Sequence, residues 1–224
     1  MKITWLGQAG LLLESRGVRI LIDPYLSDSV AAVNPKNHRR VPVEERFLRI
    51  EPDVIVCTHD HLDHTDPETL RHYLDRDGGV TVLAPQAAWQ TVRRFGHDHN
   101  YVQFNRHTRW THRHIRFTAV KAEHSDPHPI GVVIEADDKV LYITGDTLYN
   151  SDIFADLPAR IDAVFLPVNG LGNNMNMTDA RDFCRQIAPG RAIPLHCGLF
   201  DSIDMNAFDF EPKTVPVMYE EIEL

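Results

Sequence analysis

One run of six residues carries the side chains best suited to bind metal ions. Residues 59–64 read His-Asp-His-Leu-Asp-His and place three imidazoles beside carboxylates. Imidazole nitrogens and carboxylate oxygens are the ligands that first-row divalent metals prefer. This run could hold one metal ion, and together with ligands later in the chain it could hold two.

A buried strand and a capped helix are predicted on either side of this run. Residues 54–57, Val-Ile-Val-Cys, are apolar and mostly β-branched, which is typical of a buried strand. Asp66 followed by Pro67 predicts the start of a helix with Asp66 as its N-cap. His59 and His61 are two residues apart, so in extended backbone they point the same way. A short loop from strand to helix can therefore direct several ligands toward one point.

The chain has 13 histidines, so pairs of them also arise by chance. The pairs in residues 97–99 and 112–114 lack a following Asp-His, and no buried strand precedes them. We expect those pairs on solvated loops or strand faces. For residues 59–64 the alternative is a polar loop that is rich in histidine by chance, but the flanking elements favour the metal site.

Three later residues resemble these ligands in position, because each is a polar residue that directly follows a predicted apolar strand. They are His124, Asp146 and His196. Any one of them alone could be an ordinary hydrogen-bonded turn residue. Their agreement with the four-ligand run favours a shared site.

Length, composition and charge limit the classes of function. The 224 residues, 43% of them hydrophobic, suit one domain spanning 1–224 with a substantial core. The net charge of −9 argues against binding to nucleic acid, although a small anionic substrate is not excluded because metal ions supply positive charge. The three cysteines have no framework spacing, so no disulfide scaffold is expected. With no membrane-length apolar run and no signal-peptide pattern, we expect a cytoplasmic protein without a membrane partner.

The rest of the chain predicts clusters of strands with helices between them. Strands are expected at 3–6, 10–14, 18–22, 80–84, 101–104, 115–120, 130–136, 140–144, 163–167, 191–195 and 215–218, and helices at 67–74, 86–95 and 178–187, the last capped by Thr178. Residues 27–50 contain two prolines and no clear periodicity, which predicts a long surface loop. Two such clusters of strands indicate two packed sheets with helices outside.

Taken together, these residues resemble the metallo-β-lactamase superfamily. The match consists of H-x-H-x-D-H in residues 59–64, followed by His124, by Asp146 in Gly-Asp-Thr, and by a final His196. Asp23, in Leu-Ile-Asp-Pro, matches an early aspartate that usually supports the site from behind the ligands. The resemblance covers nearly the whole chain in the expected order. It implies an α+β fold, a four-layer αββα sandwich of two mixed sheets with helices on both outer faces and a dinuclear site at one edge.

Within the superfamily the chain is most similar to the group that includes L-ascorbate-6-phosphate lactonase. The similar segments are 5–10, 23–27, 58–64, 67–70, 145–149, 166–170 and 194–196. Cys197, where an aromatic residue is common, and the short C-terminal tail depart from the group. The resemblance implies a metal-dependent hydrolase that opens a small ester or lactone, such as a phosphorylated sugar-acid lactone. Members of this group are often homo-oligomers, so the resemblance makes a homo-oligomer one candidate state of this chain.

The resemblance also implies a role for each ligand. His59, His61 and His124 would hold the first metal, Asp63, His64 and His196 the second, and Asp146 would bridge them. Asp63 would orient a metal-bound hydroxide and carry a proton. Seven His and Asp ligands without a thiolate suit two divalent ions, Zn or Mn.

Contacts to the substrate are expected from two places. The Gly/Asn-rich loop 169–176 offers Asn169, Gly170 and Asn174, whose amides and backbone N–H groups could hold hydroxyls or a phosphate. The alternative is a flexible connector that uses Asn and Gly for left-handed turns. Arg39 and Arg40 in the long loop could meet an anion, and Arg40 is the candidate substrate contact, although a basic pair is usually a solvated surface.

Three other functions compete with the lactonase hypothesis. A phosphodiesterase acting on a small phosphodiester would use the same two metals. A di-iron redox protein is disfavoured because such relatives tend to carry Glu in the motif and an added flavin domain. A metal-binding protein without catalysis is disfavoured by Asp63, because binding alone needs no residue placed to hold hydroxide.

Overall fold

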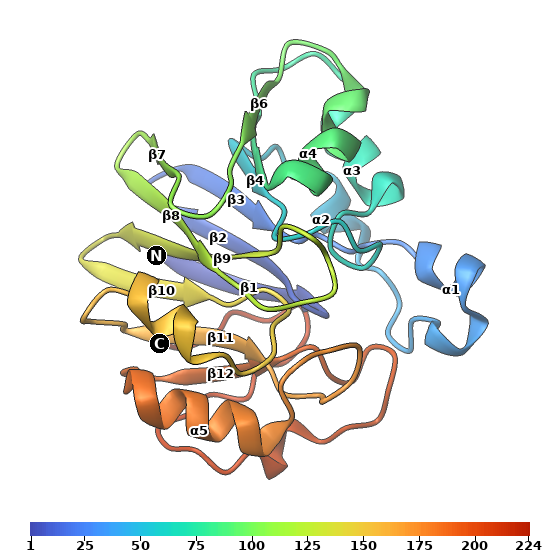
Figure 1. Ribbon diagram of the computed structural model, residues 1–224. Coiled ribbons are helices and arrows are strands. Elements are labelled where there is room, and N and C mark those ends of the chain that lie inside the picture. Colours follow the sequence, from blue (N-terminus) through green and yellow to red (C-terminus); the bar gives the residue numbers. More distant parts are fainter.

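Two six-stranded β-sheets pack face to face in the computed structural model, which describes residues 1–224 (Figure 1). The first sheet has the order β1 (Lys2–Gly7), β2 (Gly10–Ser15), β3 (Val18–Ile22), β4 (Val54–Val56), β5 (Thr81–Ala84) and β6 (Asn100–Gln103). The second has the order β12 (Ala192–Leu195), β11 (Ala163–Pro167), β10 (Lys139–Ile143), β9 (Ile130–Ala136), β8 (Ile115–Lys121) and β7 (Arg109–His112).

Both sheets mix antiparallel and parallel pairs. Strands β1 to β3 and β7 to β10 pair antiparallel, whereas β3 to β6 and β10 to β12 pair parallel. The carboxyl ends of β3, β4 and β5 therefore lie at one edge of the first sheet. The carboxyl ends of β8, β10, β11 and β12 share an edge of the second sheet, and residues that follow these strands can meet.

The short strand β4 connects two hydrophobic cores. Val54 and Val56 belong to the large cluster between the sheets, whereas Ile55 belongs to a second cluster beneath the helices of the first sheet. All three side chains are fully buried. Burial on both faces explains why this strand reads as a continuous apolar run, and each buried side chain contributes about 1.5–3 kcal/mol.

Helices cover the outer faces, as the sequence predicts. The first sheet carries α2 (Glu45–Leu48), α3 (Pro67–Leu74) and α4 (Gln86–Val92), and the second carries α5 (Met177–Ile187) (Figure 1). Helix α3 begins where predicted, because the Asp66 side chain accepts hydrogen bonds from the backbone N–H groups of Glu68 and Thr69. None of these helices is long and apolar enough to cross a membrane.

Several predictions of elements are wrong in detail. The cap of α5 is Asn176, whose side chain accepts from the N–H groups of Thr178 and Asp179, so the predicted cap Thr178 lies inside the helix. The helix predicted over 86–95 ends at Val92 and continues as a 3₁₀ turn (Arg93–Phe95). Strand β7 was not predicted, because its outward residues are polar and its apolar pattern is short.

The loop and tail also differ from expectation. Residues 27–50 contain two short helices, α1 (Ser29–Val33) and α2, and a 3₁₀ turn (Pro35–Asn37), and α1 projects from the sheets (Figure 1). Residues 215–218 form no strand. The tail instead makes isolated bridges, Lys213 to Ala192 and Glu221 to Thr4. Two further 3₁₀ turns lie at Ser151–Asp156 and Met205–Ala207.

Candidate metal centre

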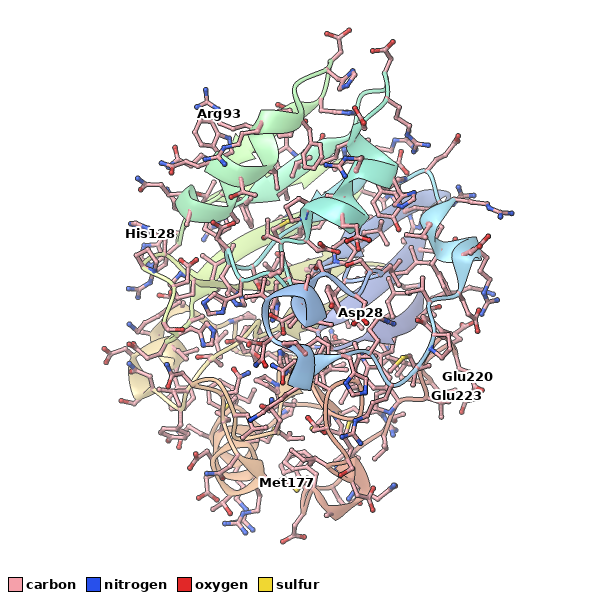
Figure 2. The ribbon with its side chains drawn as sticks, turned by 90° about the vertical axis from the view of Figure 1, so that its right-hand side faces the viewer. Asp28, Arg93, His128, Met177, Glu220 and Glu223 are labelled. Carbon is pink, nitrogen blue, oxygen red and sulfur yellow. The ribbon has the colours of Figure 1, made fainter.

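The seven predicted ligands meet at the edge where the two sheets end. The loop after β4 brings His59, His61, Asp63 and His64, and the segments after β8, β10 and β12 bring the other three. The metal-binding atoms fall into three groups, each with its atoms within 4.8 Å of one another: His59–His61–His124, His59–His64–Asp146 and Asp63–His64–His196. Figure 2 views the molecule from the side on which α1 and Asp28 lie.

The first group consists of three imidazoles. His61 Nδ1 and His124 Nε2 are 3.1 Å apart. The His59 ring packs edge-on against both neighbours, with centroid distances of 4.6 Å to His61 and 4.7 Å to His124. Two nitrogens bound to one tetrahedral zinc ion would be about 3.3 Å apart, given Zn–N bonds of about 2.0–2.1 Å. The observed spacing therefore suits one ion.

Asp63, His64 and His196, which we call the second group, combine two imidazoles with a carboxylate. His64 Nε2 and His196 Nε2 are 3.3 Å apart. Asp63 Oδ2 lies 3.4 Å from His196 Nε2 and 3.9 Å from His64 Nε2. These distances again match neighbouring ligands of a single ion.

Asp146 lies between the two groups. Its carboxylate oxygens are 3.2 Å from His64 Nε2, 3.3 Å from His196 Nε2 and 3.8 Å from His124 Nε2. A carboxylate that reaches ligands of both groups can bridge two ions. This is the role that the resemblance implies for Asp146.

The hydrogen bonds on the far side of the rings show which nitrogen is free to bind a metal. Thr58 Oγ1 donates its proton to Asp23 Oδ2 at 2.6 Å, so at 3.0 Å it accepts from His59 Nδ1–H. His59 Nε2 then carries only a lone pair, and it is buried without a hydrogen-bond partner. A buried lone pair without a donor fits a metal ligand.

Two other rings, those of His64 and His124, are held in the same way. His64 Nδ1 lies 2.8 Å from Asp23 Oδ2, and His124 Nδ1 lies 3.1 Å from the carbonyl oxygen of Asn173. Both leave Nε2 directed at the centre. Asp23 is fully buried and also accepts from the Thr58 N–H at 2.7 Å, so it lies behind the candidate ligands and is hydrogen bonded to the loop that carries them.

The charges of the centre shift its pKa values in opposite directions. Burial lowers the pKa of His64 and His196, but the facing carboxylates outweigh burial; they hold the pKa of His64 well above its usual range and raise that of His196 to about 10. Burial raises the pKa of Asp63 and Asp146, yet the facing imidazoles hold both pKa values below the ordinary range. The site without a metal therefore keeps its carboxylates ionised and balances them with protonated imidazoles, whose protons a metal ion would replace.

The Gly/Asn-rich loop 169–176 contacts candidate metal ligands. The sequence predicted either a substrate-binding loop or a flexible connector, and neither prediction included this role. Asn174 is buried, and its Nδ2 donates to Asp146 Oδ2 at 2.8 Å. Asn169 Nδ2 lies 3.1 Å from His196 Nδ1. Gly170 makes a turn with φ of +66°, where a side chain would clash with Asn176.

A cavity of about 350 Å³ opens above the ligands. It is lined by Gln8, Val30, Asn37, His61, Asp63, Ser125, Asp146, Asn169, Leu171, Gly172, Asn173, Asn174, His196, Phe200 and Asp201. Of the predicted substrate contacts, Asn169 and Asn174 line it and Gly170 does not. Arg40 is exposed and lies outside the lining, with its backbone N–H bonded to the Leu199 carbonyl.

Sequence reasoning missed Gln8 and Asp201. Gln8 lies in the tight turn between β1 and β2, and only the pairing of distant segments brings it to the site. Asp201 follows β12 in a stretch without a ligand pattern. Cys197 belongs to the core between the sheets and to none of the three ligand groups.

Comparison with known proteins agrees with this geometry. The model of the beta-lactamase superfamily domain matches residues 18–197. A UPF0173 protein of Pyrococcus furiosus is 28% identical over 94% of this chain and 90% of its own length, and a UPF0173 metal-dependent hydrolase of Methanopyrus kandleri is 29% identical over the same shares. The structure of Igni18, a metallo hydrolase from Ignicoccus hospitalis, superposes with a TM-score of 0.76 at 21% identity, covering 99% of this chain and 97% of that one. The chain belongs to the beta-lactamase superfamily and has the metallo-β-lactamase fold.

Proposed function

We propose that this protein hydrolyses a small ester or lactone in the cavity above the metal centre. The observation that carries the proposal is the position of Asp63, which lines the cavity and belongs to the second ligand group. Its side chain is 20% exposed, compared with 6% for Asp146. Asp63 is therefore the more accessible of the two ligand carboxylates that line the cavity.

Each part of the centre has a task in this reaction. Two divalent ions, Zn or Mn, would lower the pKa of a shared water molecule and polarise the substrate carbonyl. Asp63 holds the attacking water in line with the carbonyl carbon and carries its proton toward the departing oxygen. Asp146 and the imidazoles fix the spacing of the ligand groups, while Asp23, Thr58 and Asn174 keep those ligands oriented.

The size and lining of the cavity support a small substrate. About 350 Å³ is near the lower end of the range for small-molecule sites. An ester or lactone brings a neutral reacting group, whereas the negative charge of a phosphodiester would be balanced by the metal ions alone, because the lining contains no lysine or arginine. We therefore place the ester or lactone ahead of the phosphodiester.

The test is a panel of lactones, including L-ascorbate 6-phosphate, measured beside bis-p-nitrophenyl phosphate. The protein would be reconstituted separately with Zn²⁺ and Mn²⁺, and Asp63→Asn would be measured in parallel. Lactone opening that needs both the metal and Asp63 supports the proposal and identifies the active ion. Cleavage of the diester with inert lactones would replace it with a small-molecule phosphodiesterase.

A further inference from the structure

The charged residues of the cavity all have the same sign apart from the histidine ligands. The carboxylates are Asp63, Asp146 and Asp201, and no lysine or arginine is among the fifteen lining residues. Asp63 and Asp146 belong to the metal centre. Asp201 is therefore the one charged group left to meet the part of the substrate that does not react.

The Asp201 carboxylate is held in place by its own loop. Its Oδ1 accepts from the backbone N–H groups of Gly198 and Ile203, both at 2.9 Å. No protein group donates to its other oxygen, Oδ2, and no cation pairs with the side chain. A carboxylate fixed by two backbone hydrogen bonds cannot easily turn away from a bound ligand.

The arginine pair of the 27–50 loop does not line the cavity. The Arg39 guanidinium donates to the carbonyl oxygens of Tyr25 and Val41 and to the Tyr219 hydroxyl. Arg40 is exposed and outside the lining. An anionic tail that extends away from the metal centre would thus meet the Asp201 carboxylate and gain no opposite charge from a lining side chain.

The rest of the lining suits a polar but uncharged group. Amide side chains come from Gln8, Asn37 and Asn173, and short apolar surfaces come from Val30 and Leu171. Amides donate and accept hydrogen bonds without adding charge. Such a lining can hold hydroxyl, amide or small alkyl groups.

We propose that the cavity selects esters or lactones whose non-reacting part carries no negative charge, and that Asp201 is the residue that rejects anionic ones. This inference rests on the proposed function and narrows it, because it sets phosphorylated and carboxylated lactones apart from neutral ones. Two like charges about 6 Å apart in a half-solvated site reduce binding by roughly tenfold. Selection arises from this repulsion, not from a missing contact.

A pair of lactones that differ in charge tests this selection. The N-acetyl and N-succinyl derivatives of α-amino-γ-butyrolactone share the reacting ring, and the second carries an added CH2–COO⁻ group, so the effect of charge is separated from that of length by the salt dependence and by the Asp201 variants. In the metal-loaded protein we expect kcat/KM to favour the N-acetyl compound by about tenfold at low ionic strength, with a smaller ratio in high salt. Asp201→Asn should bring the ratio near one, and Asp201→Lys should reverse it. Asp209→Asn, which removes an exposed carboxylate outside the cavity, should leave the ratio as it is.

The outcomes separate this inference from the proposed function. Equal use of both lactones by the unmodified protein, or an unchanged ratio in Asp201→Asn, overturns the charge selection while lactone opening stands. If neither lactone is opened, calorimetric binding of the two corresponding lactams decides the charge selection, while the panel of lactones decides the proposed function. Tighter binding of the N-acetyl lactam that depends on Asp201 supports it, and equal binding overturns it.

Discussion

The side-chain nitrogen of Gln8 lies 3.1 Å from Asp63 Oδ2 and 3.4 Å from His196 Nδ1. The backbone carbonyl of Gln8 accepts from the indole N–H of Trp5 and from the backbone N–H of His196. The turn between β1 and β2 is thereby fastened to the loop that carries the last ligand. The Gln8 amide can orient the Asp63 carboxylate without binding a metal itself.

Replacing Gln8 with leucine should slow hydrolysis without emptying the metal centre. The variant removes the donor to Asp63 while keeping similar bulk, so we expect kcat to fall by about 10–100-fold. Metal content, measured by elemental analysis, should stay near that of the unmodified protein. Gln103→Leu makes the same change at an exposed position and serves as the control. An unchanged kcat in Gln8→Leu would show that Asp63 needs no such orientation.

Asp63→Asn tests the proton-carrying carboxylate. The amide nearly preserves the shape but cannot accept a proton, so turnover should fall by about 10²–10⁴-fold. Circular dichroism and the thermal midpoint should show an intact fold, because Asp63 lies at the cavity and not in the core. A rate close to that of the unmodified protein would remove Asp63 from the mechanism.

Asp23→Asn should weaken metal binding. The change reduces the acceptor strength offered to His64 Nδ1–H and to Thr58. Asn tolerates the φ of +42° found here, so backbone strain does not confound the result. Competition with a calibrated chelator should show affinity lower by about 10–100-fold. Equal affinities would mean that the ligands orient themselves.

Metal affinity should rise with pH. Burial lowers the pKa of His64 and His196, but the facing carboxylates of Asp146 and Asp63 outweigh burial and raise the pKa of both imidazoles. Protons therefore occupy the ligand nitrogens at neutral pH, and a metal must displace them. We expect the affinity for Zn²⁺ to increase about tenfold per pH unit between pH 6 and 8 for each proton released. Calorimetry in buffers of different ionisation enthalpy counts those protons, and a count of zero would contradict this expectation.

Asp156 is expected to stabilise the fold in a pH-dependent way. Its carboxylate accepts from two nitrogens of Arg106, from His107 and from the backbone N–H of Lys121. The Arg106 hydrogen bonds and these other donors hold the pKa of Asp156 below its ordinary value. Asp156→Asn should thus cost about 2 kcal/mol of unfolding free energy at pH 7.

The sign of the pH effect follows from the lowered pKa. The stabilisation is fully present above the unfolded pKa of about 3.9 and is lost as the pH falls toward the lower folded pKa. Urea unfolding of both proteins at pH 7 and at successively lower pH should show the difference shrinking below about pH 4. A difference that persists unchanged in acid would show that packing, and not ionisation, explains it.

The parts of the fold that sequence predicted well are those with local signals. The cap and first turn of α3 depend on residues two or three apart, and the apolar run of β4 marks burial on both faces. The ligands after the strands could be predicted because parallel strands end at a common edge. Gln8 and Asp201 could not, since their places depend on how the β1–β2 turn and the loop after β12 pack against distant segments.

The ligands come from both halves of the sandwich, four from the loop after β4 in the first sheet and three from segments of the second. Bound ions would therefore cross-link the two sheets where they meet. Metal occupancy and the docking of the two halves are then one linked equilibrium, in which each tenfold rise in free metal above its dissociation constant adds about 1.4 kcal/mol per ion to the free energy of unfolding. The catalytic ions would thus also stabilise the fold, and in a cell short of metal the protein would be less stable as well as less active.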